Sequence, residues 1–145
     1  DVSDMIRTPE VSMAASAVSA IPAVREFLFD LQRETAKKNN VVMDGRDIGT
    51  VVLPDADIKI FLTASPEERA RRRFRELKEK GIEASFEDVL TDMIKRDYDD
   101  ANRQTAPLRK AEDAITVDTT GNTFEQSLEI IKQIVQERLN ERSGS

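Results

Sequence analysis

Two residue types that commonly carry chemistry, cysteine and histidine, do not occur in this chain of 145 residues. Without cysteine there can be neither disulfides nor metal sites built from thiolates. Without histidine the chain also lacks the commonest general base and the commonest zinc ligand. Any catalysis must therefore depend on carboxylates, arginine, lysine, backbone groups or a metal held by oxygen ligands.

Long apolar runs and an excess of positive charge are absent as well. No apolar run approaches the length of a membrane span, and no signal-peptide pattern opens the chain. The net charge is −6, which makes nucleic acid a poor partner. We therefore expect a cytoplasmic protein that binds neither membranes nor nucleic acid. Because the first residue is Asp1 and not Met, we also expect the chain to begin inside a longer protein.

What is present is a globular composition with strong helix signals. Hydrophobic residues make up 39% and charged residues 34%, enough for one domain with a sizeable core. Ser65, Ser85 and Thr123 each stand three residues before a Glu, Asp or Gln, the pattern of a capping box at a helix start. The patterns predict helices over residues 10–20, 22–37, 66–80, 86–103 and from 124 onward, and strands over 41–43, 58–62 and 114–117. This alternation predicts a parallel α/β sheet that binds ligands beyond the carboxyl ends of its strands.

The segment Asp44-Gly45-Arg46-Asp47 directly follows the predicted strand 41–43. A hydrophobic run that ends in Asp has the form of a Walker B segment, whose carboxylate lies near the magnesium of a nucleotide. Arg46 could hold a phosphate through two parallel hydrogen bonds. The alternative is a polar turn with a local ion pair, and the residues alone do not decide between them.

The helix predicted over 86–103 changes character along its length. Its first half has an apolar stripe, and Arg96, Asp100 and Arg103 continue that stripe within one narrow sector. Two arginines and a carboxylate on one line suit a nucleotide, because cations bind phosphate and a carboxylate binds ribose hydroxyls. The alternative is a solvated face with pairs between Arg96 and Asp100 or Asp100 and Arg103, each contributing about 0.2–0.5 kcal/mol.

Two further segments have both a functional and a structural interpretation. The helix from residue 66 carries an arginine run in which one or two side chains could close over a triphosphate, although such a run is most often a solvated surface. The turn Asp118-Thr119-Thr120-Gly121 could line a base pocket, or could simply lead to the next helix start.

Several motifs in one order give the chain a family resemblance. Residues 41–50 (VVMDGRDIGT), followed by Pro54-Asp55-Ala56 and residues 58–62 (IKIFL), closely resemble bacterial cytidylate kinases. Residues 6–11, Arg96-Asp97, Asp100, Asn102-Arg103, residues 106–108 and residues 111–114 are similar to the same family. The resemblance covers essentially all of residues 1–140. It implies a P-loop nucleoside-monophosphate-kinase-like α/β fold, a parallel sheet with flanking helices, here truncated at the N-terminus.

The resemblance also implies an activity and a set of roles. The activity is transfer of the ATP γ-phosphate to CMP or dCMP with Mg²⁺, giving CDP or dCDP and ADP. It places Ser16, Arg25 and Asp47 at cytosine, Arg96 and Asp100 at the ribose, and Arg46 and Arg103 at the CMP phosphate. Arg46, Arg103 and Asp44 would be catalytic, with Asp44 near the magnesium without binding it directly. Arg69, Arg72 and Arg73 would lie in the lid over ATP.

The resemblance further divides the chain. Residues 1–40 would be the remainder of the monophosphate-binding insertion and its following helix. Residues 41–141 would be the core α/β domain with a lid-like region at about 67–85, and residues 142–145 a disordered tail.

One family motif is missing from these residues. None of the five glycines belongs to a Gly-rich loop ending in Gly-Lys-Ser/Thr. We therefore expect this chain alone to be inactive, and keep two alternatives: a nucleotide-binding fragment without turnover, and a non-enzymatic interaction domain. In the family the strand of that loop lies between strands 41–43 and 58–62. Because unpaired buried backbone groups cost about 1–3 kcal/mol each, we expect either a separate segment to fill that place or the two strands to pair with each other.

Overall fold

The structure is a computed structural model that describes residues 6, 8–19, 21–102 and 107–143. It divides into two compact units, Asp1–Asp44 and Gly45–Ser145, and each is described here by itself. Among the described residues, no helix is both long enough and apolar enough to cross a membrane.

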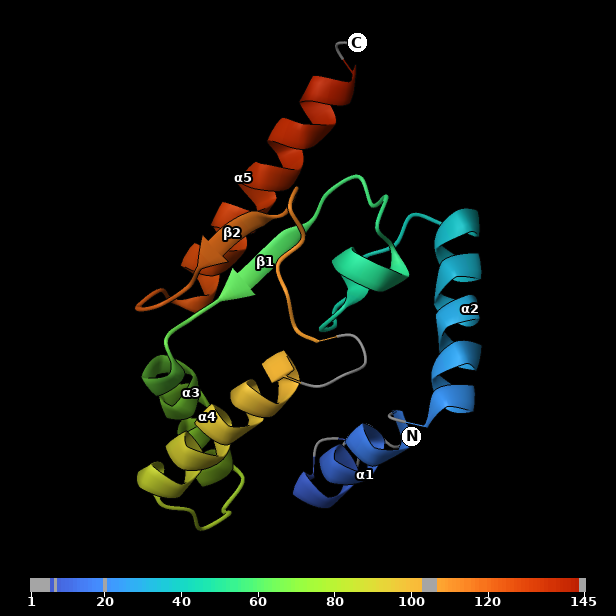
Figure 1. Cartoon of the computed structure of the whole chain (residues 1–145). Coiled ribbons are helices and arrows are strands. Elements are labelled where there is room, and N and C mark those ends of the chain that lie inside the picture. The colour runs from blue at the N-terminus through green and yellow to red at the C-terminus, as the bar shows by residue number, and fades with distance from the viewer. Residues whose placement is uncertain (1–5, 7, 20, 103–106, 144–145) are drawn as a thin grey trace. The chain divides into compact units, whose positions relative to one another are not determined.

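The first unit consists of two helices, α1 (Pro9–Ser19) and α2 (Pro22–Lys38), which contact each other (Figure 1). Pro22 begins α2, where the missing proline N–H costs nothing because the first helical amides have no partner inside the helix. The helices predicted over 10–20 and 22–37 are thus confirmed to within one residue at each end.

The buried strand predicted over residues 41–43 is wrong. Residues 41–44 form neither helix nor strand, and the side chains of Val41 and Val42 are exposed. A run of three apolar residues becomes a strand only where a neighbouring strand supplies hydrogen bonds to its backbone. In the described part of the chain no strand pairs with this segment. Of the two outcomes expected for segments 41–43 and 58–62, their pairing is not found, because the sheet of the described residues has two strands and neither includes residues 41–43. The other outcome, a separate segment between them, stays a prediction.

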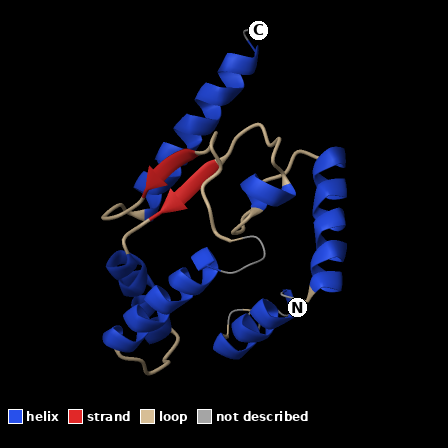
Figure 2. Ribbon diagram, in the orientation of Figure 1, coloured by secondary structure: helices blue, strands red, loops and turns tan. Residues whose placement is uncertain are grey.

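The second unit is built on two parallel strands, β1 (Ile60–Thr63) and β2 (Ile115–Asp118), which Figure 2 shows side by side. They pair in register from Ile60 opposite Ile115 to Thr63 opposite Asp118. Both strands begin one or two residues later than predicted, and their parallel pairing agrees with the predicted α/β class. The small core around them consists of buried apolar side chains: Val52, Ala64, Ala70, Leu77, Ala114 and Val117.

Helices connect and follow these strands. A short π-helical turn, η1 (Ile48–Val52), precedes β1, while α3 (Pro66–Glu79) and α4 (Phe86–Asn102) lie between β1 and β2. The last helix, α5 (Phe124–Ser143), follows β2 after a short turn (Figure 1). The helix α3 ends just before Gly81, whose φ of +70° is a backbone conformation that glycine adopts readily.

The predicted capping boxes form as side-chain hydrogen bonds. The backbone amide of Glu68 donates to Ser65 Oγ at 3.2 Å, and that of Asp88 donates to Ser85 Oγ at 3.0 Å. At the start of α5 the bonds are reciprocal: Gln126 N donates to Thr123 Oγ1, and Thr123 N donates to Gln126 Oε1. These bonds satisfy backbone amides that have no partner within the helix, so the local sequence alone determines where these helices begin.

Candidate functional site

The carboxyl ends of β1 and β2 are tied together by threonines. The backbone amide and the hydroxyl of Thr119, which follows β2, both donate to the carbonyl of Thr63 at the end of β1, at 2.8 and 3.1 Å. The amide of Ser65 donates to Thr120 Oγ1 at 2.9 Å. In a parallel sheet this edge is where ligands bind, so the polar side chains gathered here form the candidate site.

Arg69, in the first turns of α3, is fixed at this edge by a hydrogen-bonded fork. Its Nε donates to the carbonyl of Ala64, just after β1, at 3.1 Å. Its Nη1 donates to Asp97 Oδ1 at 2.8 Å, and its Nη2 donates to Asp97 Oδ2. About a third of each side chain is exposed, 34% for Arg69 and 36% for Asp97, so the pair is open to solvent. Because both oxygens and both terminal nitrogens take part, the plane of the guanidinium is fixed as well as its position.

A second ion pair connects the segment after residue 44 to α4. Arg46 Nε donates to Asp100 Oδ2, and the Asp100 side chain is only 19% exposed. The neighbouring Asp47 is buried, and its backbone carbonyl accepts hydrogen bonds from the amides of Val51 and Val52 at 2.9 and 3.2 Å. The turn η1 therefore fixes Asp47 directly beside Arg46.

These two pairs belong to one electrostatic cluster. The pKa of the Asp97 carboxyl lies below its ordinary value, first because of the hydrogen bonds from Arg69, and then because of the charges of Arg69, Arg46 and Arg96. In return, the hydrogen bonds that Arg69 donates to Asp97 raise the pKa of Arg69. Three guanidiniums and two carboxylates thus lie close together at one edge of the sheet. Such a cluster suits a ligand with several phosphate oxygens, for which arginine forks are well matched.

The family resemblance implied that Arg72 and Arg73 lie in a lid. In the structure both side chains form hydrogen bonds with other residues of the chain. Arg72 Nε donates to Glu68 Oε1 at 3.1 Å, and its Nη atoms donate to Thr119 Oγ1 at 3.2 Å and to the Thr119 carbonyl at 2.6 Å. Arg73 donates to Glu76 Oε2 at 2.9 Å on the same helix. Arg72 thus holds α3 against the turn that follows β2.

The turn after β2 also has an internal structure of its own. The amide and the hydroxyl of Thr120 both donate to Asp118 Oδ1, at 2.9 and 2.6 Å, and these bonds lower the pKa of the exposed Asp118 carboxyl. Gly121 continues the turn with a φ of +76°. These contacts are those of a local turn that leads to α5.

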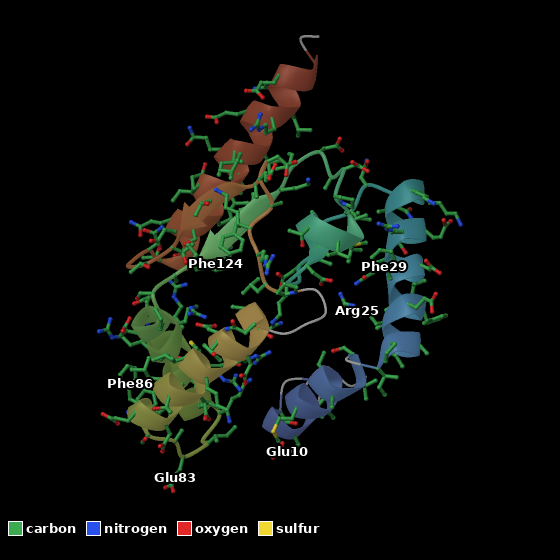
Figure 3. All side chains as sticks on the ribbon, in the orientation of Figure 1. Glu10, Arg25, Phe29, Glu83, Phe86 and Phe124 are labelled. Carbon is green, nitrogen blue, oxygen red and sulfur yellow. The ribbon has the colours of Figure 1, made fainter. Side chains whose placement is uncertain are left out.

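The remaining predicted site residues are distributed over both units. Arg25 is half-buried on α2 and lies on the same side of that helix as Phe29 (Figure 3). Asp44 is exposed at the end of the first unit, and Arg96 is exposed on α4. Ser16 is on α1, but the orientation of its side chain lies outside the described structure. Arg103 also lies outside the described residues.

Sequence reasoning assigned no role to two of the residues that organise this unit. Asp97 lies beside the predicted charged sector of α4, and its position next to Arg96 was the available signal. Lys59 gave no signal, yet its side chain is only 8% exposed and its Nζ donates to both oxygens of Asp113, at 2.9 and 2.7 Å. Lys59 lines an open cavity of about 490 Å³ together with Gly49, Pro107 and Lys110.

Comparison with known proteins agrees with this α/β architecture. Residues 1–137 match the family model described as cytidylate kinase. A cytidylate kinase of Carboxydothermus hydrogenoformans is 57% identical over 135 residues, which are 93% of this chain and 61% of that protein. One of Thermosipho melanesiensis is 50% identical over 94% of the chain, and one of Geobacter sulfurreducens is 49% identical over all of it.

The fold and the matches define an α/β protein of the P-loop nucleoside-monophosphate-kinase class. Within that class, the chain belongs to the cytidylate kinase family. It spans about three-fifths of the length of the curated relatives it matches, with 61–63% of the three proteins covered.

Proposed function

We propose that the protein containing this chain is a cytidylate kinase that transfers the γ-phosphate of ATP to CMP or dCMP, giving CDP or dCDP and ADP. The observation that carries the proposal is the cluster of Arg46, Arg69 and Arg96 at the carboxyl edge of a parallel sheet in a chain of this family. Phosphoryl transfer depends mostly on positioning and on neutralising charge. It therefore needs no histidine, because the CMP phosphate is itself the nucleophile.

The proposal assigns roles to the two ends of the substrate. Arg46 and Arg103 hold the CMP phosphate and align it for attack. Arg96 and Asp100 bind the ribose, and the cytosine is recognised by Ser16, Arg25 and Asp47. The burial of Asp47 beside Arg46 supports its part, because a desolvated carboxylate accepts well from the exocyclic amine of cytosine.

The ATP side is assigned to α3. Arg69, Arg72 and Arg73 serve the donor phosphates, and the position of Arg69 at the carboxyl edge of β1 supports its part. Arg72 and Arg73 would have to exchange partners within the protein for phosphate oxygens.

Magnesium enters as the partner of ATP. In the described ranges no group of three or more acidic side chains comes together in a way that could hold a metal ion. Magnesium would be carried by the nucleotide phosphates, with Asp44 near it.

The test is a titration of the full-length protein with CMP, UMP and AMP, followed by turnover with MgATP. We expect selective binding of CMP, or of dCMP, and formation of ADP and CDP. Equal affinity for the three monophosphates, or no binding to any of them, would overturn the proposal. The second outcome would favour an interaction domain.

One observation favours a second candidate for residues 1–145 taken alone, a nucleotide-binding fragment without turnover. These 145 residues contain no Gly-rich loop ending in Gly-Lys-Ser/Thr, the segment that cradles the donor phosphates in P-loop kinases. Selective CMP binding without any ADP formation in the presence of MgATP would establish this second candidate.

A further inference from the structure

We propose that Asp97 is a positioning residue that holds the Arg69 guanidinium at the carboxyl edge of β1, where it meets the phosphates of the donor nucleotide. This inference rests on the proposed function, since it deepens the assignment of Arg69 to the ATP side. Its basis is the pair of hydrogen bonds from the Arg69 guanidinium to the Asp97 carboxylate, together with the hydrogen bond from Arg69 Nε to the carbonyl of Ala64.

The fork leaves part of the Arg69 guanidinium available for a ligand. A guanidinium has five N–H groups in a fixed plane. Three of them donate to Asp97 Oδ1, Asp97 Oδ2 and the Ala64 carbonyl. Across the described ranges, the other two N–H groups have no hydrogen-bond partner. With the plane fixed and two donors remaining in a side chain that is one-third exposed, Arg69 is prepared to bind an anion without first having to be ordered.

The charges around Asp97 explain why a carboxylate is needed at this position. Arg46 and Arg96 lie near enough to Asp97 to lower the pKa of its carboxyl, in addition to the direct effect of Arg69. With a neutral side chain at residue 97, the guanidiniums of Arg46, Arg69 and Arg96 would share only the carboxylate of Asp100. Their mutual repulsion would then displace Arg69, whose side chain extends from a different helix.

The pair is not needed to hold the two helices together. Further along α3 and α4, Phe74 and Phe86 pack edge to face with ring centroids 6.2 Å apart. Ala70 and Leu77 of α3 are buried as well. An ion pair that is one-third exposed adds little stability to such a contact. We therefore infer that its principal effect is on the position of Arg69 and not on the folding of the unit.

The experiment compares Asp97→Asn with the full-length wild-type protein in steady-state kinetics, varying ATP at saturating CMP and CMP at saturating ATP. The amide keeps the size of the side chain and removes its charge. We expect kcat/KM for ATP to fall about 10- to 100-fold, while KM for CMP changes less than about threefold. Asp97→Glu should recover part of the loss. Asp99→Asn, the same change on an exposed position of α4, should match wild type.

A double-mutant cycle separates positioning from a structural role. If Asp97 acts through Arg69, Asp97→Asn should add less than about twofold to the loss already caused by Arg69→Ala. Additive losses, or an Asp97→Asn variant with an unchanged kcat/KM for ATP, would overturn the inference. A lowered Tm with unchanged kinetics would do so as well.

The proposed function and this inference fail separately. A wild-type protein that binds ATP but does not phosphorylate CMP refutes only the function, and calorimetric titration with MgATP then tests Asp97 directly. In that titration, weaker binding to Asp97→Asn than to Asp99→Asn supports the inference, and equal binding refutes it. A wild-type protein that binds no ATP refutes both.

Discussion

Replacing Arg72 tests whether an arginine of α3 contributes to the stability of the fold. Its guanidinium donates to Glu68 Oε1, to Thr119 Oγ1 and to the Thr119 carbonyl, and Thr119 is only 3% exposed. Replacing Arg72 with Met keeps much of the aliphatic stem and removes all three donors. The carbonyl of the buried Thr119 then loses its charged donor and keeps only the hydrogen bond from the Asn122 amide, at 3.1 Å.

The expected magnitude follows from these contacts. A hydrogen bond from a charged donor contributes about 1.5–3 kcal/mol, and Arg72 makes two such bonds to Thr119. The Arg72 side chain is 39% exposed, so water replaces part of what is lost and the bond to Glu68 adds little. We expect Arg72→Met to lower the free energy of unfolding by about 2 kcal/mol, which in the full-length protein lowers Tm by about 4–8 °C.

The assay is urea denaturation of the full-length protein followed by circular dichroism, with Arg71→Met as the matched control. Arg71 is on the same helix, but its side chain is 64% exposed and its ion pair with Glu68 is long, at 3.7 Å. The control should change the free energy of unfolding by less than about 0.5 kcal/mol. If both variants lose the same stability, Arg72 does not hold the turn, and its conformation in the structure is only one of several.

Further predictions concern the helix start, the acid limit of stability and the proposed substrate contacts. Ser85→Ala should lower the free energy of unfolding by about 1 kcal/mol, because it removes the acceptor for the Asp88 amide, whereas Thr91→Ala on the exposed face should not. Because Arg69 lowers the folded-state pKa of Asp97 beneath its ordinary 3.8, the carboxylate stabilises the fold above that pH and loses this effect as the pH falls. Because the pair is one-third exposed, Asp97→Asn should reduce the fall in Tm between about pH 5 and pH 3 only slightly, and a steeper fall in the variant would contradict this. In the active protein, Asp47→Ala should weaken CMP binding by about 1.5–3 kcal/mol and ATP binding less, as measured by calorimetry. Arg103→Lys should reduce turnover about a hundredfold with a smaller change in CMP affinity, because an ammonium cannot hold two phosphate oxygens in one plane, and near-normal turnover would refute the role.

Sequence reasoning was most accurate where the decisive interactions are local. The starts of α3, α4 and α5 depend on a side chain and an amide three residues apart, so the capping pattern was sufficient to locate them. The family also followed from the sequence, because its motifs are short runs in a fixed order. Within the charged sector of α4, the Asp100 carboxylate pairs with Arg46, 54 residues away, a contact that the sector itself did not indicate.

The failures concern interactions between distant segments. An apolar run such as residues 41–43 has the composition of a strand, but its backbone becomes a strand only if another strand pairs with it, and the run itself does not contain that information. Composition likewise could not show that Arg72 binds the turn after β2, or that Lys59 is buried against Asp113.

By itself, the amino-acid sequence determined the family, the positions of the helices and the residue types available for chemistry. Only the tertiary structure decided which charges meet, because arginines spaced along one helix are equivalent until the chain brings acceptors to them. The partners of Arg69 and Arg72, namely Asp97 and Thr119, are 28 and 47 residues away. The fold brings them to the carboxyl edge of one small parallel sheet. There Arg72 contacts the buried Thr119, whereas Arg69 pairs with an Asp97 side chain that is open to solvent.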